Sequence, residues 1–188
     1  MTAYKCIVAD PPWPETGAGK IKRGADRHYP LMKVHEIIAM APLVKTWADP
    51  EGCHLYLWAT NNYLHDAMHV MEAWGFRYVT CITWVKDRIG LGQYFRGITE
   101  HCLFGVMGKV PYQILPEGGR AQGITGFTAK RKEHSRKPNN VHEMAETVSP
   151  GPRLEMFARP PVRAGWSAHG NEVDSEDLSG SKQGRLFA

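Results

Sequence analysis

The chain has 188 residues, of which 43% are hydrophobic and 22% charged, and its formal net charge is +4. These values are typical of one globular domain with a hydrophobic core of its own. No apolar run approaches bilayer length, which excludes a membrane-spanning chain. The first residues do not resemble a signal peptide. We therefore expect no membrane partner.

The cysteines indicate the redox environment. They lie far apart in the sequence, each in or beside an apolar run, as expected for buried thiols of a reduced, cytoplasmic protein rather than for a disulfide framework. No CxxC pair exists, and neither Cys53-His54 nor His101-Cys102 has the spacing of zinc ligands, so we predict no metal site. The four cysteines are Cys6, Cys53, Cys81 and Cys102.

Strands alternate with helices along the chain. Short apolar runs predict strands at Cys6–Ala9 and at residues 54–59, 78–85, 100–107 and 154–158. Apolar residues at helical spacing predict helices at residues 34–40 and 63–74, and from Asn140 onward, where Glu143 would complete a capping box. The alternation favours an α/β fold, with a mostly parallel sheet and helices on both faces, in a single domain of residues 1–173.

The remaining segments lack periodicity. Residues 14–30, 87–97 and 108–137 are predicted to be loops, and residues 174–188 a flexible tail. Basic side chains gather in the first and third of these loops. A solvated surface would explain either cluster alone, but two clusters near one strand end favour contacts with phosphates.

The first predicted strand ends in Asp10, Pro11, Pro12 and Trp13. The prolines stop the strand, leaving a carboxylate, two stiff carbonyls and an indole at a carboxyl end, where open α/β sheets bind ligands. This group offers acceptors and a π face but no strong nucleophile. It suits a planar ligand with an exocyclic amine, such as adenine or cytosine. The alternative is an ordinary strand-to-turn boundary with a buried tryptophan.

Further segments follow in a fixed order. After ADPPW come His28-Tyr29-Pro30, LYLWAT, ITWVKD, EHCLFGVMGK, HSRKP, SPGPRLEMFAR and GWSAHGNE. Over residues 5–173 this series resembles the DPPW-type N6-adenine methyltransferases, a family named for the seventy-kilodalton subunit of the messenger-RNA adenosine methyltransferase. The resemblance implies a Rossmann-like fold with a circularly permuted motif order, in which DPPW precedes the cofactor strand. It also implies S-adenosyl-L-methionine (SAM) as the methyl donor.

The resemblance further implies which side chains bind the cofactor. Lys137 would hold the SAM carboxylate, as a point charge can, and Glu155 would face the methionine amine. Lys137, Arg159 and Asn171 could each instead be an ordinary surface or turn residue. The expected cofactor-binding set is Asp10, Lys137, Glu155, Phe157, Arg159, Asn171 and Glu172.

The same resemblance suggests a mechanism. The adenine amine is a poor nucleophile because its lone pair is delocalised into the ring. Asp10 and the Pro11 carbonyl, accepting one N–H each, would localise that lone pair and stabilise the developing positive charge. Trp13 and Tyr29 would sandwich the base. The expected substrate-binding set is His28, Tyr29, Lys86 and Arg96.

Three functions stay open at this point. The first is a DNA adenine methyltransferase of a bacterium or phage. The second is an RNA adenosine methyltransferase with the same chemistry, although the sequence shows no separate RNA-binding module. The third is a catalytically silent nucleic-acid-binding homologue, against which the joint presence of Asp10, Trp13, Lys137 and Asn171 argues. We predict the first, with DNA preferred over RNA as the partner.

Overall fold

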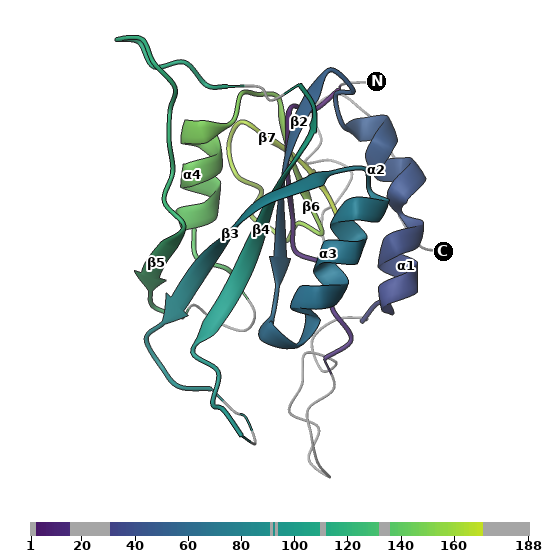
Figure 1. The fold of residues 1–188 in the computed structure, drawn as a ribbon, viewed down its shortest axis with the longest axis vertical. Coiled ribbons are helices and arrows are strands. Elements are labelled where there is room, and N and C mark those ends of the chain that lie inside the picture. Colours follow the sequence, from purple (N-terminus) through teal and green to yellow (C-terminus); the bar gives the residue numbers. More distant parts are fainter. Residues whose placement is uncertain are drawn as a thin grey trace.

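A computed structural model describes residues 3–15, 31–90, 92, 94–109, 112–131 and 136–170. Within these ranges the chain forms a twisted sheet of seven strands, in the order β5-β3-β4-β2-β1-β6-β7, flanked by helices (Figure 1). The strands are β1 Cys6–Ala9, β2 Gly52–Ala59, β3 Arg77–Lys86, β4 Thr99–Gly108, β5 Gly126–Ala129, β6 Arg153–Met156 and β7 Trp166–His169.

The sheet is mostly parallel, as the sequence predicts. Strand β1 pairs in parallel with β2 and with β6, β6 with β7, and β3 with β5. Strand β4 runs antiparallel to both of its neighbours, β2 and β3. Because β4 is reversed, its first residues lie at the sheet edge where the other strands end, which is the ligand-binding edge of such sheets.

Helices cover both faces of the sheet, which confirms the predicted fold class. The helices α1 Val34–Ala39, α2 Ala41–Trp47 and α3 Leu64–Ala73 lie on one face, and α4 Asn140–Val148 lies on the other (Figure 1). A short 3-10 helix, Asn61–Tyr63, precedes α3. Alternate residues of β1 enter the two cores: Ile7 and Ala9 pack toward α1–α3, and Cys6 and Val8 toward α4. Strand periodicity therefore decides which layer each β1 side chain joins.

Several element predictions were incomplete or wrong. Residues 108–137 contain β5, and the GWSAHGNE segment contains β7, neither of which the sequence patterns predicted. A second helix, α2, follows α1 and carries a proline in its first turn, where the missing N–H has no helical partner to lose. The capping box at Asn140 was wrong, since Asn139 is the N-cap and makes no side-chain capping bond. The tail lies outside the described residues.

Among the described residues, no helix combines the length and apolar character needed to cross a bilayer.

Candidate active site

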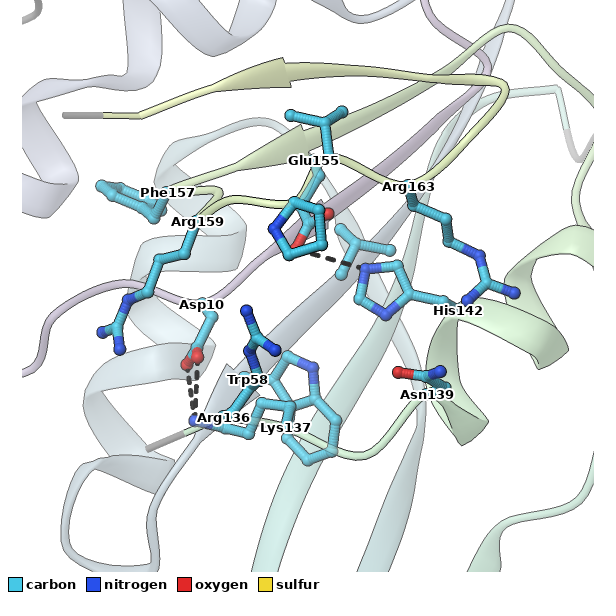
Figure 2. Close-up of a pocket in the computed structure, with 13 residues that line it drawn as sticks. Asp10, Trp58, Arg136, Lys137, Asn139, His142, Glu155, Phe157, Arg159 and Arg163 are labelled. Atoms are coloured by element: carbon cyan, nitrogen blue, oxygen red, sulfur yellow. Dashed lines mark hydrogen bonds and ion pairs between the residues drawn. The ribbon is translucent and has the colours of Figure 1, made fainter. Parts of the chain in front are cut away.

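The candidate site lies where parallel strands end side by side. Asp10 follows β1, Phe157 follows β6 and Gly170 follows β7. A cavity of about 340 Å³ opens at this edge, on the α4 side of the sheet (Figure 2). Its walls come from β1, β2, the start of α4 and the turn after β6, through Val8, Asp10, Trp58, Arg136, Lys137, Asn139, His142, Glu155, Phe157, Arg159, Pro161, Val162 and Arg163.

A chain of alternating charges begins in this cavity at Asp10 and Lys137 and continues outside it. The Lys137 ammonium lies 2.9 Å from Asp10 and 3.4 Å from Glu100 Oε2. Lys86 Nζ lies 2.5 Å from Glu100 Oε1. The four side chains are between 15% and 29% exposed, so solvent screens them less than it would screen surface pairs. The reversed direction of β4 is what brings Glu100 to Lys137.

The two carboxylates of this chain respond differently to their surroundings. Burial raises the pKa of Asp10 above its ordinary value, and the Lys137 ammonium opposes that rise only in part. Burial alone would also raise the pKa of Glu100, but Lys137 and Lys86 together outweigh it and hold that pKa below its ordinary value. Glu100 is thus a permanent anion at neutral pH, while Asp10 has the greater affinity for a proton.

Trp13 lies outside the cavity, in the core beneath α1–α3. Its side chain is 5% exposed, its Nε1 donates to the Trp58 carbonyl over 2.9 Å, and its ring stacks on Tyr63 with centroids 5.6 Å apart. The indole therefore holds the DPPW turn onto the sheet. The motif's acid belongs to the cavity and its tryptophan to the core.

The two proline carbonyls already accept one backbone bond each. Pro11 accepts from the Trp13 N–H over 2.8 Å, and Pro12 from the Met32 N–H over 2.9 Å. A carbonyl oxygen has two lone pairs, so each can accept a second hydrogen bond. These bonds fix the direction in which the remaining lone pairs point.

The turn after β6 forms the opposite wall of the cavity. Phe157 has a φ of 60°, a left-handed conformation that is costly for a bulky residue and recurs at ligand sites. This turn ends β6 at Met156, two residues earlier than predicted. At Gly170 an added Cβ would stand 2.6 Å from the Ala158 carbonyl oxygen, so the close approach of β7's end to this turn requires glycine.

The residues present suit SAM. Its cationic amine needs an acceptor, which Glu155 provides, and its carboxylate needs a cation, which Lys137 provides. Phe157 and Trp58 add apolar wall surface, and the volume lies within the range of small-molecule sites. Glu155 also contacts α4, since its Oε1 lies 3.4 Å from His142 Nε2 (Figure 2).

Apart from Pro11, Pro12 and Trp13, the predicted site residues divide into three groups. Asp10, Lys137, Glu155, Phe157 and Arg159 line one cavity. Lys86 joins the charge chain, and Arg96 lies on an exposed hairpin, where its Nε donates to the Gly90 carbonyl. The third group lies outside the described residues and comprises His28, Tyr29, Asn171 and Glu172.

Sequence reasoning missed some residues of the site, which line the cavity or, like Glu100, contact a lining residue. Trp58 and Glu100 stand in the segments LYLWAT and EHCLFGVMGK, but those segments alone gave no role to either residue. The Lys137 Nζ lies 5.5 Å from the Trp58 ring centre, which favours the ammonium at this position. Asn139, the N-cap of α4, and His142, in its first turn, are three residues apart, a spacing that could have indicated their shared face.

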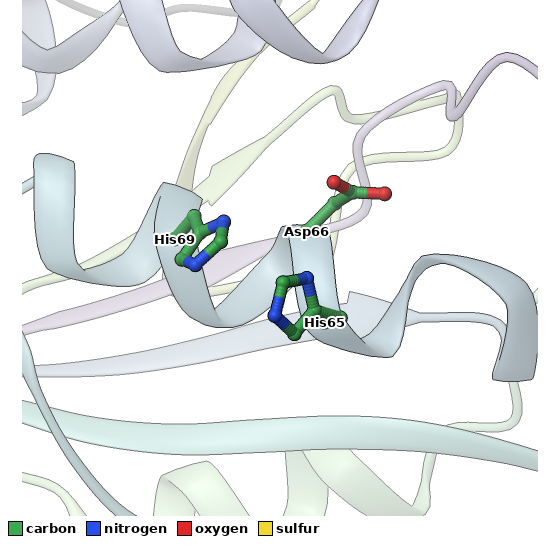
Figure 3. A group of neighbouring side chains, drawn as sticks. All are labelled: His65, Asp66 and His69. Atoms are coloured by element: carbon green, nitrogen blue, oxygen red, sulfur yellow. The ribbon is translucent and has the colours of Figure 1, made fainter.

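One further group of potential ligands lies on α3. The side chains of His65, Asp66 and His69 place their ligand atoms within 4.8 Å of one another, and both histidines are exposed (Figure 3). Helix α3 covers the face of the sheet opposite to α4, so this group takes no part in the chemistry of the cavity.

Comparison with known proteins agrees with this geometry. The MT-A70 family model matches residues 4–172. A putative N(6)-adenosine-methyltransferase MT-A70-like protein of Medicago truncatula is 30% identical over 190 residues, which is 93% of this chain and 27% of that protein. The human N(6)-adenosine-methyltransferase catalytic subunit METTL3 is 33% identical over 136 residues, 66% of this chain and 22% of METTL3.

A bacterial protein matches over most of its length. The type II methyltransferase M.MunI of a Mycoplasma species is 27% identical over 203 residues, covering 97% of this chain and 83% of that protein. The chain thus spans about a quarter of the length of the plant and human relatives and most of the length of the bacterial one. MT-A70 methyltransferases use SAM, in agreement with the cofactor predicted from the sequence. The chain belongs to the MT-A70 family of methyltransferases.

Proposed function

We propose that this chain transfers a methyl group from SAM to the N6 amine of adenine in DNA. The observation that carries the proposal is the position of Asp10. Its carboxylate stands at the edge of a cofactor-sized cavity, directly before two proline carbonyls that each retain a lone pair. An acceptor-rich edge without a strong nucleophile suits the activation of an amine that the substrate itself supplies.

The chain's own residues would bind and orient both reactants. SAM, when bound, supplies an activated methyl group. Lys137 would turn from Asp10 toward the cofactor carboxylate, and Glu155 would accept from its amine. This arrangement leaves Asp10 available to the target base. Holding the amine in line with the transferred group supplies the orientation part of catalysis.

Asp10 would act first as an acceptor and then as the proton's first destination. Accepting one amine N–H draws the nitrogen lone pair out of the ring, and the Pro11 carbonyl can accept the other N–H. Once the nitrogen becomes positively charged it turns acidic and releases a proton. The raised pKa of Asp10 makes its carboxylate a better recipient for that proton than an exposed aspartate would be.

Two observations support DNA over RNA. The match to the type II methyltransferase M.MunI covers 83% of that protein, whereas METTL3 is covered over 22%. Type II is a term of DNA restriction and modification. The runner-up is RNA, which the 30–33% identity to N(6)-adenosine-methyltransferases favours.

One assay tests the proposal. The protein is incubated with methyl-labelled SAM and with duplex DNA, single-stranded DNA or RNA, and the nucleosides are then resolved by mass spectrometry. We expect N6-methyladenine in DNA, absent from the Asp10→Asn variant. N4-methylcytosine as the main product would contradict the adenine assignment, and faster labelling of RNA would contradict the DNA assignment. No labelled nucleoside in any polymer would indicate a catalytically silent homologue.

A further inference from the structure

The connection between β3 and β4 projects beyond the end of the sheet as a hairpin (Figure 1). The structure describes its residues 87–90, 92 and 94–98. Backbone bonds cross it from Lys86 N to the Ile98 carbonyl and from Gly90 N to the Gly97 carbonyl, both at 2.7 Å. Arg96 Nε donates to the Gly90 carbonyl over 3.0 Å. These hydrogen bonds hold the described residues of the projection in a hairpin conformation.

Two adjacent aromatic side chains stand at the tip of this hairpin. Tyr94 is 93% exposed and Phe95 is 92% exposed. The turn beside them is built on a glycine, because a Cβ on Gly92 would stand 1.9 Å from the Phe95 carbonyl oxygen. Single exposed apolar residues are common, but two neighbouring aromatics presented on a tight turn indicate a binding surface.

The base of the hairpin is part of the candidate active site. Lys86 and Glu100 flank the hairpin and form an ion pair with each other. Glu100 also contacts Lys137, which forms an ion pair with Asp10. Gly90 is four positions after Lys86, so the Gly90–Gly97 bond lies at most about 14 Å beyond Lys86. Phe95 is two residues from Gly97, so the tip lies at most about 21 Å beyond Lys86, which at about 3.4 Å per nucleotide is a span of about six nucleotides.

The charge around the aromatics favours a polyanion. Arg88 and Arg96 lie on the hairpin, and Lys130 and Arg131 lie beside its base, all of them exposed. The Asp87 carboxylate is engaged by the Arg131 N–H at 2.9 Å. An apolar protein partner would have to bury Arg88 and Arg96 without water, which is costly, whereas a nucleic-acid strand offers them phosphates. Aromatics beside a basic surface are typical of sites that stack on bases.

We propose that Tyr94 and Phe95 stack on bases that flank the target adenine a few nucleotides along the strand, and that in duplex DNA they enter the stack there. The proposal rests on the proposed function, because it extends the same site from one base to its neighbours. Side chains that insert between base steps offset part of the cost of unstacking. The hairpin would therefore contribute to duplex substrates in particular.

Binding tests this proposal independently of methyl transfer. The probe is a fluorescent mixed-sequence 20-mer, single-stranded or duplex, titrated by anisotropy over a series of salt concentrations. We expect the Tyr94→Ala/Phe95→Ala variant to bind the single strand about tenfold more weakly or worse. The slope of log affinity against log salt should stay unchanged, because no phosphate contact is lost, whereas Arg88→Gln/Arg96→Gln should reduce that slope.

Two further variants serve as controls. Tyr78→Ala removes a 42% exposed aromatic at the opposite end of β3 and should leave the affinity unchanged. Tyr94→Trp/Phe95→Trp keeps the stacking surfaces and should retain the affinity. Unchanged binding by the double alanine variant would overturn the proposal. So would a change confined to oligomeric state, measured by light scattering, since it would show that the tip binds another copy of the chain.

Methylation supplies the second readout. On native genomic DNA we expect the double alanine variant to lose about tenfold or more of its rate, with a smaller loss on the same DNA after heat denaturation, because denatured strands need no base flipping. Equal losses on both substrates would overturn the role in opening the duplex. If the wild-type protein methylates nothing, the proposed function fails while the anisotropy result still decides whether the hairpin binds bases.

Discussion

Lys137 Nζ lies 2.9 Å from the carboxylate of Asp10, although the two residues are 127 positions apart in the sequence. This ion pair engages the acceptor that the proposed reaction requires. A carboxylate bound in the cavity would compete with Asp10 for the same ammonium. Cofactor binding and the availability of Asp10 are therefore coupled.

Replacing Asp10 by asparagine should stop methyl transfer with little loss of stability. Its side chain is 29% exposed and contributes no apolar core surface. Loss of one acceptor that stabilises developing charge costs on the order of a hundredfold or more in rate. Turnover of labelled SAM, measured beside a thermal melt, checks both statements. An Asp10→Asn protein with near-normal turnover would remove Asp10 from the mechanism.

Replacing Trp13 by alanine should destabilise the fold. The motif suggested that this indole faces the base, but Trp13 is only 5% exposed and packs in the core. Removing a buried tryptophan typically costs about 3–5 kcal/mol of unfolding free energy. Trp13→Phe should cost less, because it keeps an aromatic ring in the core and loses only part of the ring volume together with the hydrogen bond to the Trp58 carbonyl. Denaturant titration of the two variants gives the comparison, and equal stabilities for Trp13→Ala and wild type would contradict the packing described here.

Replacing Lys137 by alanine should weaken SAM binding. A charge-assisted contact in a partly buried site is worth roughly 1.5–3 kcal/mol, or about ten- to 150-fold in affinity. Lys130→Ala is the matched control, because Lys130 is exposed and lies outside the cavity. Calorimetry with SAM distinguishes the two variants. Similar affinities in both would mean that the ammonium serves Asp10 and Glu100 alone.

The pH dependence of the reaction should report Asp10. Burial raises the pKa of Asp10 above 3.8, so the rate should fall on the acid side with an apparent pKa above that value. Lys137 opposes the rise, so Lys137→Gln should move this acid limb to higher pH. A rate profile at saturating SAM separates the shift from weaker cofactor binding. A limb that moved to lower pH would contradict the assignment.

Acid should weaken the fold through Glu146. Hydrogen bonds from Arg163 and Trp166 hold the pKa of Glu146 at about 2, below its ordinary 4.5. The unfolded chain then binds the extra proton between these values, so stability falls as the pH falls through that window. Glu146→Gln should differ from wild type above pH 4.5 and converge with it toward pH 2. A difference that stayed constant over this range would exclude this ion pair as the cause.

Local chemistry explains what the sequence predicted well. The run Cys6–Ala9 is a strand with those same bounds, because four apolar residues are stopped by an acid and two prolines within a few positions. Lys137 and Asp10 were both assigned to the cofactor site, and the structure places them in contact. That assignment came from the order of the motifs along the chain and their resemblance to the methyltransferase family, because no local sequence pattern relates two residues so far apart.

Tertiary pairing explains what the sequence missed. Strands β5 and β7 have four residues each and owe their extended form to a neighbouring strand, so their own patterns are weak. Glu100 lies at the site because β4 runs antiparallel to β2. A run of hydrophobic residues predicts a strand but not the direction in which that strand pairs. Trp13 was expected to face a ligand, but its position beneath α1–α3 depends on Tyr63 and Trp58, some 45–50 residues later.

The alternation of side chains along β1 limits which insertions and deletions the gene can tolerate in this segment. Val8 and Asp10 line the same cavity because they are two positions apart, while Ala9 between them packs into the opposite core. Inserting or deleting a single codon in this stretch would carry the carboxylate to the wrong side of the sheet. Loops in such a lineage can gain or lose residues one at a time, but the segment that carries Asp10 cannot.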